Sequence, residues 1–201
     1  MHDPRVKVGV GIGYATGTYG ADHMNAPHDP YFADEKSWTF QTVKPLGMYQ
    51  PMHPTDITTE KVRTYALLDT LWKMMDGLGL CVFGFAPRGI MPLDQMVQCV
   101  NAVTGWNASL FELMKAAERA TMIARAFNSR EGFTIKDDRM PGRLFDPKPD
   151  GPNAGEKILD PEEFTKGVEL FHQIIGCDPE TGRPNPGKLL ELGLEWVDEL
   201  L

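Results

Sequence analysis

The fold is decided by residues 56–81, which read DITTEKVRTYALLDTLWKMMDGLGLC. The segment opens with hydroxyl and carboxyl side chains followed by Glu60, a combination that caps a helix and can close a capping box. Glycines at 77 and 79 end it, because glycine adopts the left-handed conformation that closes a helix. Between these ends, apolar residues recur at the spacing of one buried helical face: Val62, Ala66, Leu67, Leu71, Trp72 and Met75.

A cysteine, Cys81, follows directly after the predicted helix end, close to backbone amides and to the carboxyl group of Asp76. Such a position suits a thiolate bound to a metal, or a polar heterocycle held at the helix end. It is also the ordinary end of a helix. The local pattern by itself favours this second interpretation, with Cys81 as a small buried hydrophobic residue.

The composition is that of a globular protein in water. The 201 residues are enough for a sizeable core, with 42% hydrophobic and 24% charged residues. The sequence shows neither a long apolar run nor a signal-peptide pattern, so we expect a cytoplasmic protein with no membrane partner. The net charge of −8 argues against a nucleic-acid partner, since proteins of that class usually carry a basic surface.

The three cysteines, at positions 81, 99 and 177, leave at least one thiol unpaired and do not form the framework of a secreted disulfide-rich protein. The sequence contains no Cys-x-x-Cys and no His-x-x-x-His, so it does not by itself show a four-ligand zinc or iron–sulfur site. Any cluster needs ligands from elsewhere. Cys99 falls inside a predicted helix and is expected in the core.

The other segments predict a mainly α-helical fold, a multi-helical domain over residues 1–201. The glycine-rich run Gly9–Gly20 lacks a dinucleotide fingerprint and a P-loop, and it predicts a tightly packed helix or a turn followed by a helix. Residues 25–54 show no sustained period and predict a long ordered loop, a kind of segment that often lines a site. Further helices are predicted at about 92–103, 107–127, 160–176, 186–192 and 194–200.

Several side chains and segments allow more than one interpretation. Glu118 and Arg119 interrupt the apolar face of the longest helix, either as an ion pair or at the lip of a cavity. The polar run 127–141 is typical of a solvated hinge, and the connection 82–89 is expected to pack beneath Cys81. The longest helix is expected to bury Leu110, Phe111, Leu113, Met114, Ala117, Met122, Ile123 and Phe127.

Five motifs stand in order along the chain: His2-Asp3-Pro4-Arg5; Tyr14-Ala15-Thr16 with Gly20-Ala21-Asp22-His23; Asp76-x-x-Gly79-Leu80-Cys81; Phe127-Asn128-x-Arg130-Glu131-Gly132-Phe133 with Lys136-Asp137-Asp138; and Leu192-Gly193-Leu194-Glu195-Trp196. Together they resemble the C-terminal part of the aldehyde:ferredoxin oxidoreductase family, the tungsten- or molybdenum-pterin enzymes. The resemblance spans nearly the whole chain and does not depend on one motif.

This resemblance implies helical C-terminal domains and the oxidation of an aldehyde to a carboxylic acid, with electrons passing through a [4Fe–4S] cluster to ferredoxin. It implies that Asp76, Gly79 and Leu80 contact the pterin of a tungsto- or molybdo-bispterin cofactor, and that Cys81 is one ligand of the cluster. His23 resembles the histidine beside the metal, where it would be catalytic by donating to a substrate oxygen or moving a proton.

The sequence also departs from the family pattern. Thr18-Tyr19 stands where the family has a residue followed by arginine, and residues 25–54 form a longer loop than usual. The family's N-terminal pterin-binding β domain, with its Cys-x-x-Cys-x-x-x-Cys, has no counterpart in these residues. We therefore expect the isolated chain to bind no cofactor, to need that N-terminal half as a partner, and to self-associate through exposed apolar surface.

Two alternatives remain open at the level of sequence. One is a helical module that has no catalytic role and serves in assembly or binding. The other is an enzyme of the same fold that acts on aromatic acyl-thioesters.

Overall fold

The computed structural model describes residues 2–85, 91–151 and 153–201. Over these residues the chain is helical, with two isolated β-bridges and no strand, which confirms the predicted mainly α-helical fold. The α-helices are α1 Val8–Thr16, α2 Trp38–Val43, α3 Thr59–Gly77, α4 Leu93–Thr104, α5 Leu110–Arg130, α6 Pro161–Ile175, α7 Pro186–Glu191 and α8 Glu195–Asp198. Short 3-10 turns are η1 Pro4–Val6, η2 Asp29–Phe32, η3 Lys44–Leu46 and η4 Gly142–Leu144.

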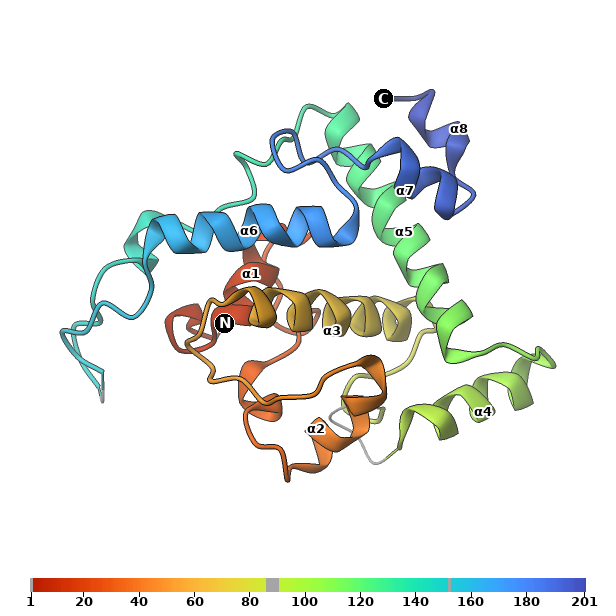
Figure 1. The fold of residues 1–201 in the computed structure, drawn as a ribbon, viewed down its shortest axis with the longest axis horizontal. Helices are drawn as coiled ribbons and strands as arrows, with labels where there is room; N and C mark the ends of the chain where they lie inside the picture. The colour runs from red at the N-terminus through yellow and green to blue at the C-terminus, as the bar shows by residue number, and fades with distance from the viewer. Residues whose placement is uncertain (1, 86–90, 152) are drawn as a thin grey trace.

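The helix α3 lies at the centre of the molecule. Figure 1 shows α6 alongside α3 and α5 crossing near the end of α3. Both α5 and α6 contact α3. The α1 helix also contacts both α3 and α6. Because neighbours cover several sides of α3, it buries residues around most of its circumference, including the polar Lys61, Thr64 and Asp69.

Three hydrophobic clusters hold these helices together. The C-terminal half of α3 packs in the first, the N-terminal half of α3 in the second, and α5 in the third. The first joins Leu71, Trp72 and Met75 to Phe40, Met96 and Leu113. The second joins Val62 and Tyr65 to Ile12, Phe164 and Phe171. The third joins Met122 to Cys177, Leu189, Leu194 and Val197. That residues 1–201 form one domain stays a prediction.

The predicted helix starts are confirmed at their caps. The Thr58 side chain accepts a hydrogen bond from the backbone amide of Lys61 at the start of α3, where Glu60 pairs with Arg63 instead of closing a capping box. Ser109 and Glu112 form a full capping box at α5, and Asp160 accepts from two amides at α6. No helix among the described residues is long and apolar enough to cross a membrane.

The prediction of a long ordered loop over residues 25–54 is wrong in part, because this segment contains η2, α2 and η3. Ser37 caps α2 by accepting from the amide of Phe40, and Phe40 and Val43 are fully buried against α3. A helix of six residues makes fewer than two turns, so its sequence is too short to show a helical period.

Several residues predicted in the core are exposed. On α5, Phe111, Ile123 and Phe127 lie at the surface, and the helix continues past Phe127 to Arg130. Cys99 is also exposed, because α4 turns the stripe formed by Leu93, Met96 and Val100 towards the core and Cys99 lies outside that stripe.

Candidate functional site

The end of α3 fixes the positions of Asp76 and Cys81. The amide of Gly79 donates to the carbonyl of Asp76 at 3.0 Å, and the amide of Leu80 donates to the carbonyl of Met75 at 2.9 Å. Gly79 has a φ of +68°, so these two bonds form a Schellman motif. Leu80 packs against the cluster that contains Met75, the apolar contact that usually accompanies this motif. The hydrogen bonds of this motif therefore define the backbone geometry at the end of α3.

The end of α3 is exposed to solvent. Asp76 and Cys81 are both exposed, and a Cβ atom added to Gly77 or Gly79 would meet no atom within 4 Å. The interpretation of Cys81 as a buried residue is therefore wrong. Its neighbour Leu80 takes up the space against the core, which leaves the thiol at the surface.

The connection predicted to pack beneath Cys81 packs against the core in the part that the structure describes, and its place beneath the site that Cys81 faces stays a prediction. Val82 and Phe85 pack against the core cluster of α3, whereas Phe83 is exposed. The rest of this prediction, residues 86–89, lies outside the described residues.

The side chain of Lys73 links α3 to the loop formed by residues 17–25, which carries His23. Its Nζ lies 3.6 Å from Oδ1 of Asp69 and 3.4 Å from the carbonyl oxygen of Asn25, to which it donates. Partial burial raises the pKa of Asp76; Lys73 opposes this shift and Asp22 adds to it. The loop therefore lies close enough to the end of α3 for Asp22 and Asp76 to interact.

His23 lies half-buried among two other histidines. Its ring centroid is 5.2 Å from that of His2, and the His2 and His28 centroids are 4.6 Å apart. The Nε2 of His28 donates to the carbonyl oxygen of His23 at 2.8 Å. Sequence reasoning missed this cluster because His2 and His28 have no ligand spacing. Among the residues described here, no group of three or more His, Cys, Asp or Glu side chains could hold a metal ion.

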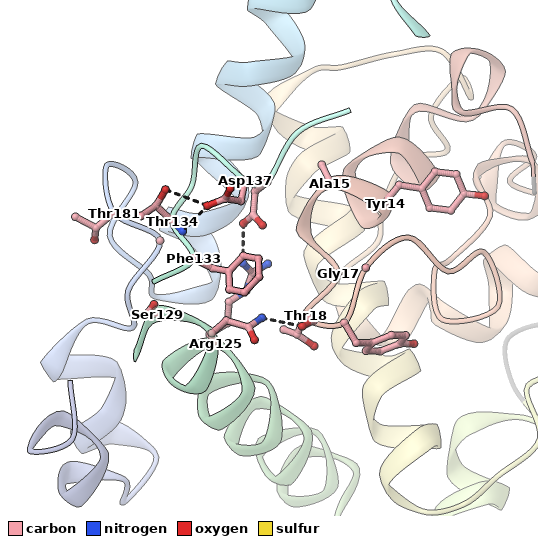
Figure 2. A pocket seen from close by; sticks show the side chains of 15 residues that line it. Tyr14, Ala15, Gly17, Thr18, Arg125, Ser129, Phe133, Thr134, Asp137 and Thr181 are labelled. Atoms are coloured by element: carbon pink, nitrogen blue, oxygen red, sulfur yellow. Dashed lines mark hydrogen bonds and ion pairs between the residues drawn. The ribbon is translucent and has the colours of Figure 1, made fainter. Parts of the chain in front are cut away.

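The first half of the loop formed by residues 17–25 lines a pocket of about 370 Å³. Figure 2 shows it between the loop after α1, the end of α5 and the segment that follows α5. Tyr14, Tyr19 and Phe133 contribute aromatic rings, and hydroxyl groups come from threonines 18, 134 and 181. No sequence pattern predicted this pocket, since its walls come from three separate stretches of the chain, residues 14–20, 125–138 and 181–182.

A buried ionic network forms one wall of this pocket. The Nη1 of Arg125 lies 2.6 Å from Oδ2 of Asp138, and Nε2 of His172 lies 2.7 Å from the same oxygen. Arg125 also donates to the carbonyl of Thr16. Burial raises the pKa of Asp138, but the hydrogen bond from His172 and the charge of Arg125 outweigh it and hold this pKa below its usual value.

The interpretation of residues 127–141 as a solvated hinge is therefore wrong at Asp138, whose side chain is 15% exposed. The signal that could have found the network is the position of Arg125 between the apolar residues Met122 and Ala126 on α5. A charged residue on a buried helical face needs a partner, since an unpaired buried charge is costly.

Glu118 and Arg119 do not pair with each other. Glu118 forms ion pairs with Lys115 and Lys188, and Arg119 donates to the carbonyl of Leu192. The alternative interpretation is confirmed for Glu118, which lines a cavity of about 170 Å³ together with Lys188. These contacts tie α5 to α7.

Comparison with known proteins finds similarity over nearly the whole chain. Residues 1–194 match the sequence model of a family described as aldehyde ferredoxin oxidoreductase, domains 2 and 3. The chain is 33% identical over 196 residues to the tungsten-containing aldehyde ferredoxin oxidoreductase of Pyrococcus horikoshii and, equally, to that of Pyrococcus abyssi. It is 32% identical over 195 residues to the enzyme of that name from Thermococcus kodakarensis.

Each of these alignments covers 96% of the chain but only 29% of the relative. The chain therefore spans less than a third of the length of the curated relatives it matches. Since the family match extends over almost all of its residues, the chain belongs to the aldehyde ferredoxin oxidoreductase family.

Proposed function

We propose that this chain is the C-terminal cofactor-binding portion of a tungsten- or molybdenum-pterin enzyme that oxidises an aldehyde to a carboxylic acid and passes the electrons through a [4Fe–4S] cluster to ferredoxin. The observation that carries the proposal is the end of α3, where a Schellman motif presents Asp76 and Cys81 at an open surface. The family membership and the tungsten-containing relatives support it.

The thiol of Cys81 fits the role of one cluster ligand. It is exposed, it follows a rigid helix end, and iron–sulfur clusters are held by cysteine thiolates. The described residues offer no complete metal site, so the other ligands would come from the rest of the enzyme. That remainder, in the same polypeptide or in another subunit, is the partner that this proposal requires.

The residues before Cys81 fit a heterocyclic cofactor. The Asp76 carboxylate can accept hydrogen bonds from the amino and ring N–H groups of a pterin, which supplies the redox chemistry together with its metal. Gly77 and Gly79 leave open space beside the backbone. Because the amides of Gly79 and Leu80 donate within the helix end, their carbonyl oxygens are the groups left for contact with the cofactor.

His23 is the proposed catalytic residue. Its loop is held towards the end of α3 by the hydrogen bond that Lys73 donates to the carbonyl oxygen of Asn25. An imidazole beside the reacting centre can donate a hydrogen bond to a substrate oxygen or move a proton.

The experiment that tests the proposal is production of the chain together with the remaining part of the enzyme from its own source. Iron, tungsten or molybdenum and pterin are then measured, as well as aldehyde-dependent reduction of ferredoxin. The Cys81→Ser variant should lose iron and cluster absorbance, and Cys99→Ser, which changes another exposed cysteine, should keep both. Asp76→Asn should lower the pterin content, whereas Asp94→Asn, on exposed α4 surface, should not.

Each negative result has a distinct meaning. Full iron content in Cys81→Ser would remove Cys81 from the ligand set. An assembled protein without metal or pterin would favour the helical assembly or binding module. Activity on an aromatic acyl-thioester and none on aldehydes would retain the cofactor site and change the substrate.

A further inference from the structure

The loop formed by residues 17–25 connects the two candidate regions, because its first half lines the 370 Å³ pocket and its second half carries His23. None of these nine residues is buried. Gly17 leaves α1 with extended backbone and Gly20 has a φ of +103°, so the loop abandons helical geometry at once. Apolar burial does not fix its place. Hydrogen bonds to neighbouring elements must do so.

The bonds inside the loop set only its local shape. The amide of Gly20 donates to the carbonyl of Gly17 at 3.1 Å, and the amide of Met24 donates to Oδ1 of Asp22 at 2.8 Å. Both bonds close short turns within the loop. Neither bond joins the loop to a neighbouring helix.

The bonds from outside the loop set its position. The Nδ2 of Asn128 donates to the carbonyl oxygen of Thr18 at 2.7 Å. In the second half of the loop, His28 donates to the carbonyl oxygen of His23 at 2.8 Å and Lys73 donates to that of Asn25 at 3.4 Å. Of the two links to a long helix, Asn128 makes the shorter one, and it holds the half of the loop that lines the pocket.

The part of α5 that carries Asn128 is itself held in place by other contacts. Asn128 lies one turn beyond Arg125 on α5, and side chains three positions apart share a helical face. Arg125 donates to the carbonyl of Thr16 and is itself held by the buried carboxylate of Asp138. Figure 2 shows Thr18 close to the end of α5 that carries Arg125, and Asn128 donates to Thr18 from the same end of the helix. The end of α5 therefore holds the chain at residues 16 and 18.

We infer that Asn128 is a positioning residue: its amide sets the place of the first half of the loop 17–25, and with it one wall of the pocket, and it acts together with His28 and Lys73 on the position of His23. The part that concerns His23 in catalysis rests on the proposed function. The placement of the loop does not.

The test uses the purified chain and the variant Asn128→Ala. Alanine is the best helix former, so α5 is expected to persist. Loss of one hydrogen bond from a surface loop should raise the exchange rates of the Gly20 and Met24 amides by roughly fivefold to tenfold. The nuclear Overhauser contact between the rings of His2 and His23 should weaken, since their centroids are 5.2 Å apart in the wild-type chain. If Asn128 only contributed to the overall stability of the chain, its substitution would not change the Gly20 and Met24 exchange rates and the His2–His23 contact selectively.

Asn101→Ala is the matched control. Asn101 also lies near the end of a helix and binds a loop through its side-chain amide, with two contacts of 2.9 Å to the backbone of Ala108. It should speed exchange at Ala108 and leave Gly20, Met24 and the His2–His23 contact unchanged. Asn128→Asp serves as a second test variant, because it keeps the size of asparagine and removes the Nδ2 donor.

Two readouts decide the inference. It is supported when Asn128→Ala and Asn128→Asp both loosen the loop and the remaining amides keep their wild-type rates. It is overturned when the loop signals stay at wild-type values in either folded variant, or when exchange rises uniformly over the chain in both. Because these measurements need no metal or pterin, their failure leaves the proposed cofactor site untouched.

In the assembled enzyme the same variants should lower kcat. A displacement of about 1 Å at a reacting group costs up to about a hundredfold in rate. The expected loss for Asn128→Ala is roughly tenfold in kcat, with wild-type iron and pterin content. A loosened loop with an unchanged kcat would support the inference that Asn128 places the loop. It would contradict the part of the inference that concerns His23 in catalysis.

Discussion

The Oδ2 atom of Asp138 lies 2.6 Å from Nη1 of Arg125, and the two side chains are only 15% and 7% exposed. His172, which is fully buried, contacts the same oxygen at 2.7 Å. This single carboxylate therefore joins α5, the segment that follows it and α6. Its removal would leave a buried guanidinium without its counter-charge.

We expect Asp138→Asn to lower the free energy of unfolding by about 3–5 kcal/mol, the cost typical of breaking a buried ion pair on one side. Urea unfolding followed by circular dichroism measures this change. Glu131→Gln is the control, since Glu131 pairs with Arg130 at about half exposure and such surface pairs contribute about 0–1 kcal/mol. Equal effects of the two substitutions would contradict the assignment of Asp138 as a stabilising buried charge.

The same carboxylate predicts a dependence of stability on pH. The native pKa of Asp138 is lowered, because the hydrogen bond from His172 and the charge of Arg125 outweigh the effect of burial. Its stabilising contribution is therefore complete above the unfolded value of about 3.9 and is lost as the pH falls through the lower native value. The unfolding free energy of the wild-type chain should decrease below about pH 5 more steeply than that of Asp138→Asn. If the unfolding free energies of the two proteins fall in parallel with pH, another acidic group is responsible for the pH dependence of stability.

The three cysteines should differ in reactivity. Cys81 and Cys99 are exposed, whereas Cys177 is fully buried and burial raises its pKa to about 12. Because the thiolate is the reactive form, a disulfide reagent at neutral pH should modify two thiols rapidly and the third only after unfolding.

Single substitutions identify the thiols that react. Cys81→Ser and Cys99→Ser should each reduce the rapid count to one, and Cys177→Ser should leave it at two. Three rapid thiols in the folded wild-type chain would mean that the third hydrophobic cluster opens readily.

The two glycines at the end of α3 should respond to alanine with opposite signs. Gly79 has a φ of +68°, where a Cβ atom costs about 1–2 kcal/mol, so Gly79→Ala should destabilise the chain. Gly77 is helical and its added Cβ would meet nothing within 4 Å, so Gly77→Ala should stabilise α3 by up to about 1 kcal/mol. Thermal unfolding of the two variants measures the difference. Equal shifts would contradict the Schellman geometry.

Much of the fold could be predicted because helix ends are encoded by neighbouring residues. Thr58, Ser109 and Asp160 cap helices through amides two or three positions away, and Gly79 closes α3 within one turn. The short helix α2 escaped prediction, since six residues are too few to show a period. For the candidate site, the motif that contains Asp76 and Cys81 could be found, but the exposure of Cys81 could not.

The sequence by itself determined the helical class, the main helix boundaries and the order of family motifs, because each depends on residues close together in the chain. Only the tertiary structure decided which polar groups meet. Asp138 pairs with a guanidinium 13 positions away and an imidazole 34 positions away, and Asn128 holds a loop 110 positions away. Such contacts depend on how α5 and α6 pack around α3, and packing of that kind leaves no periodic signal in the sequence.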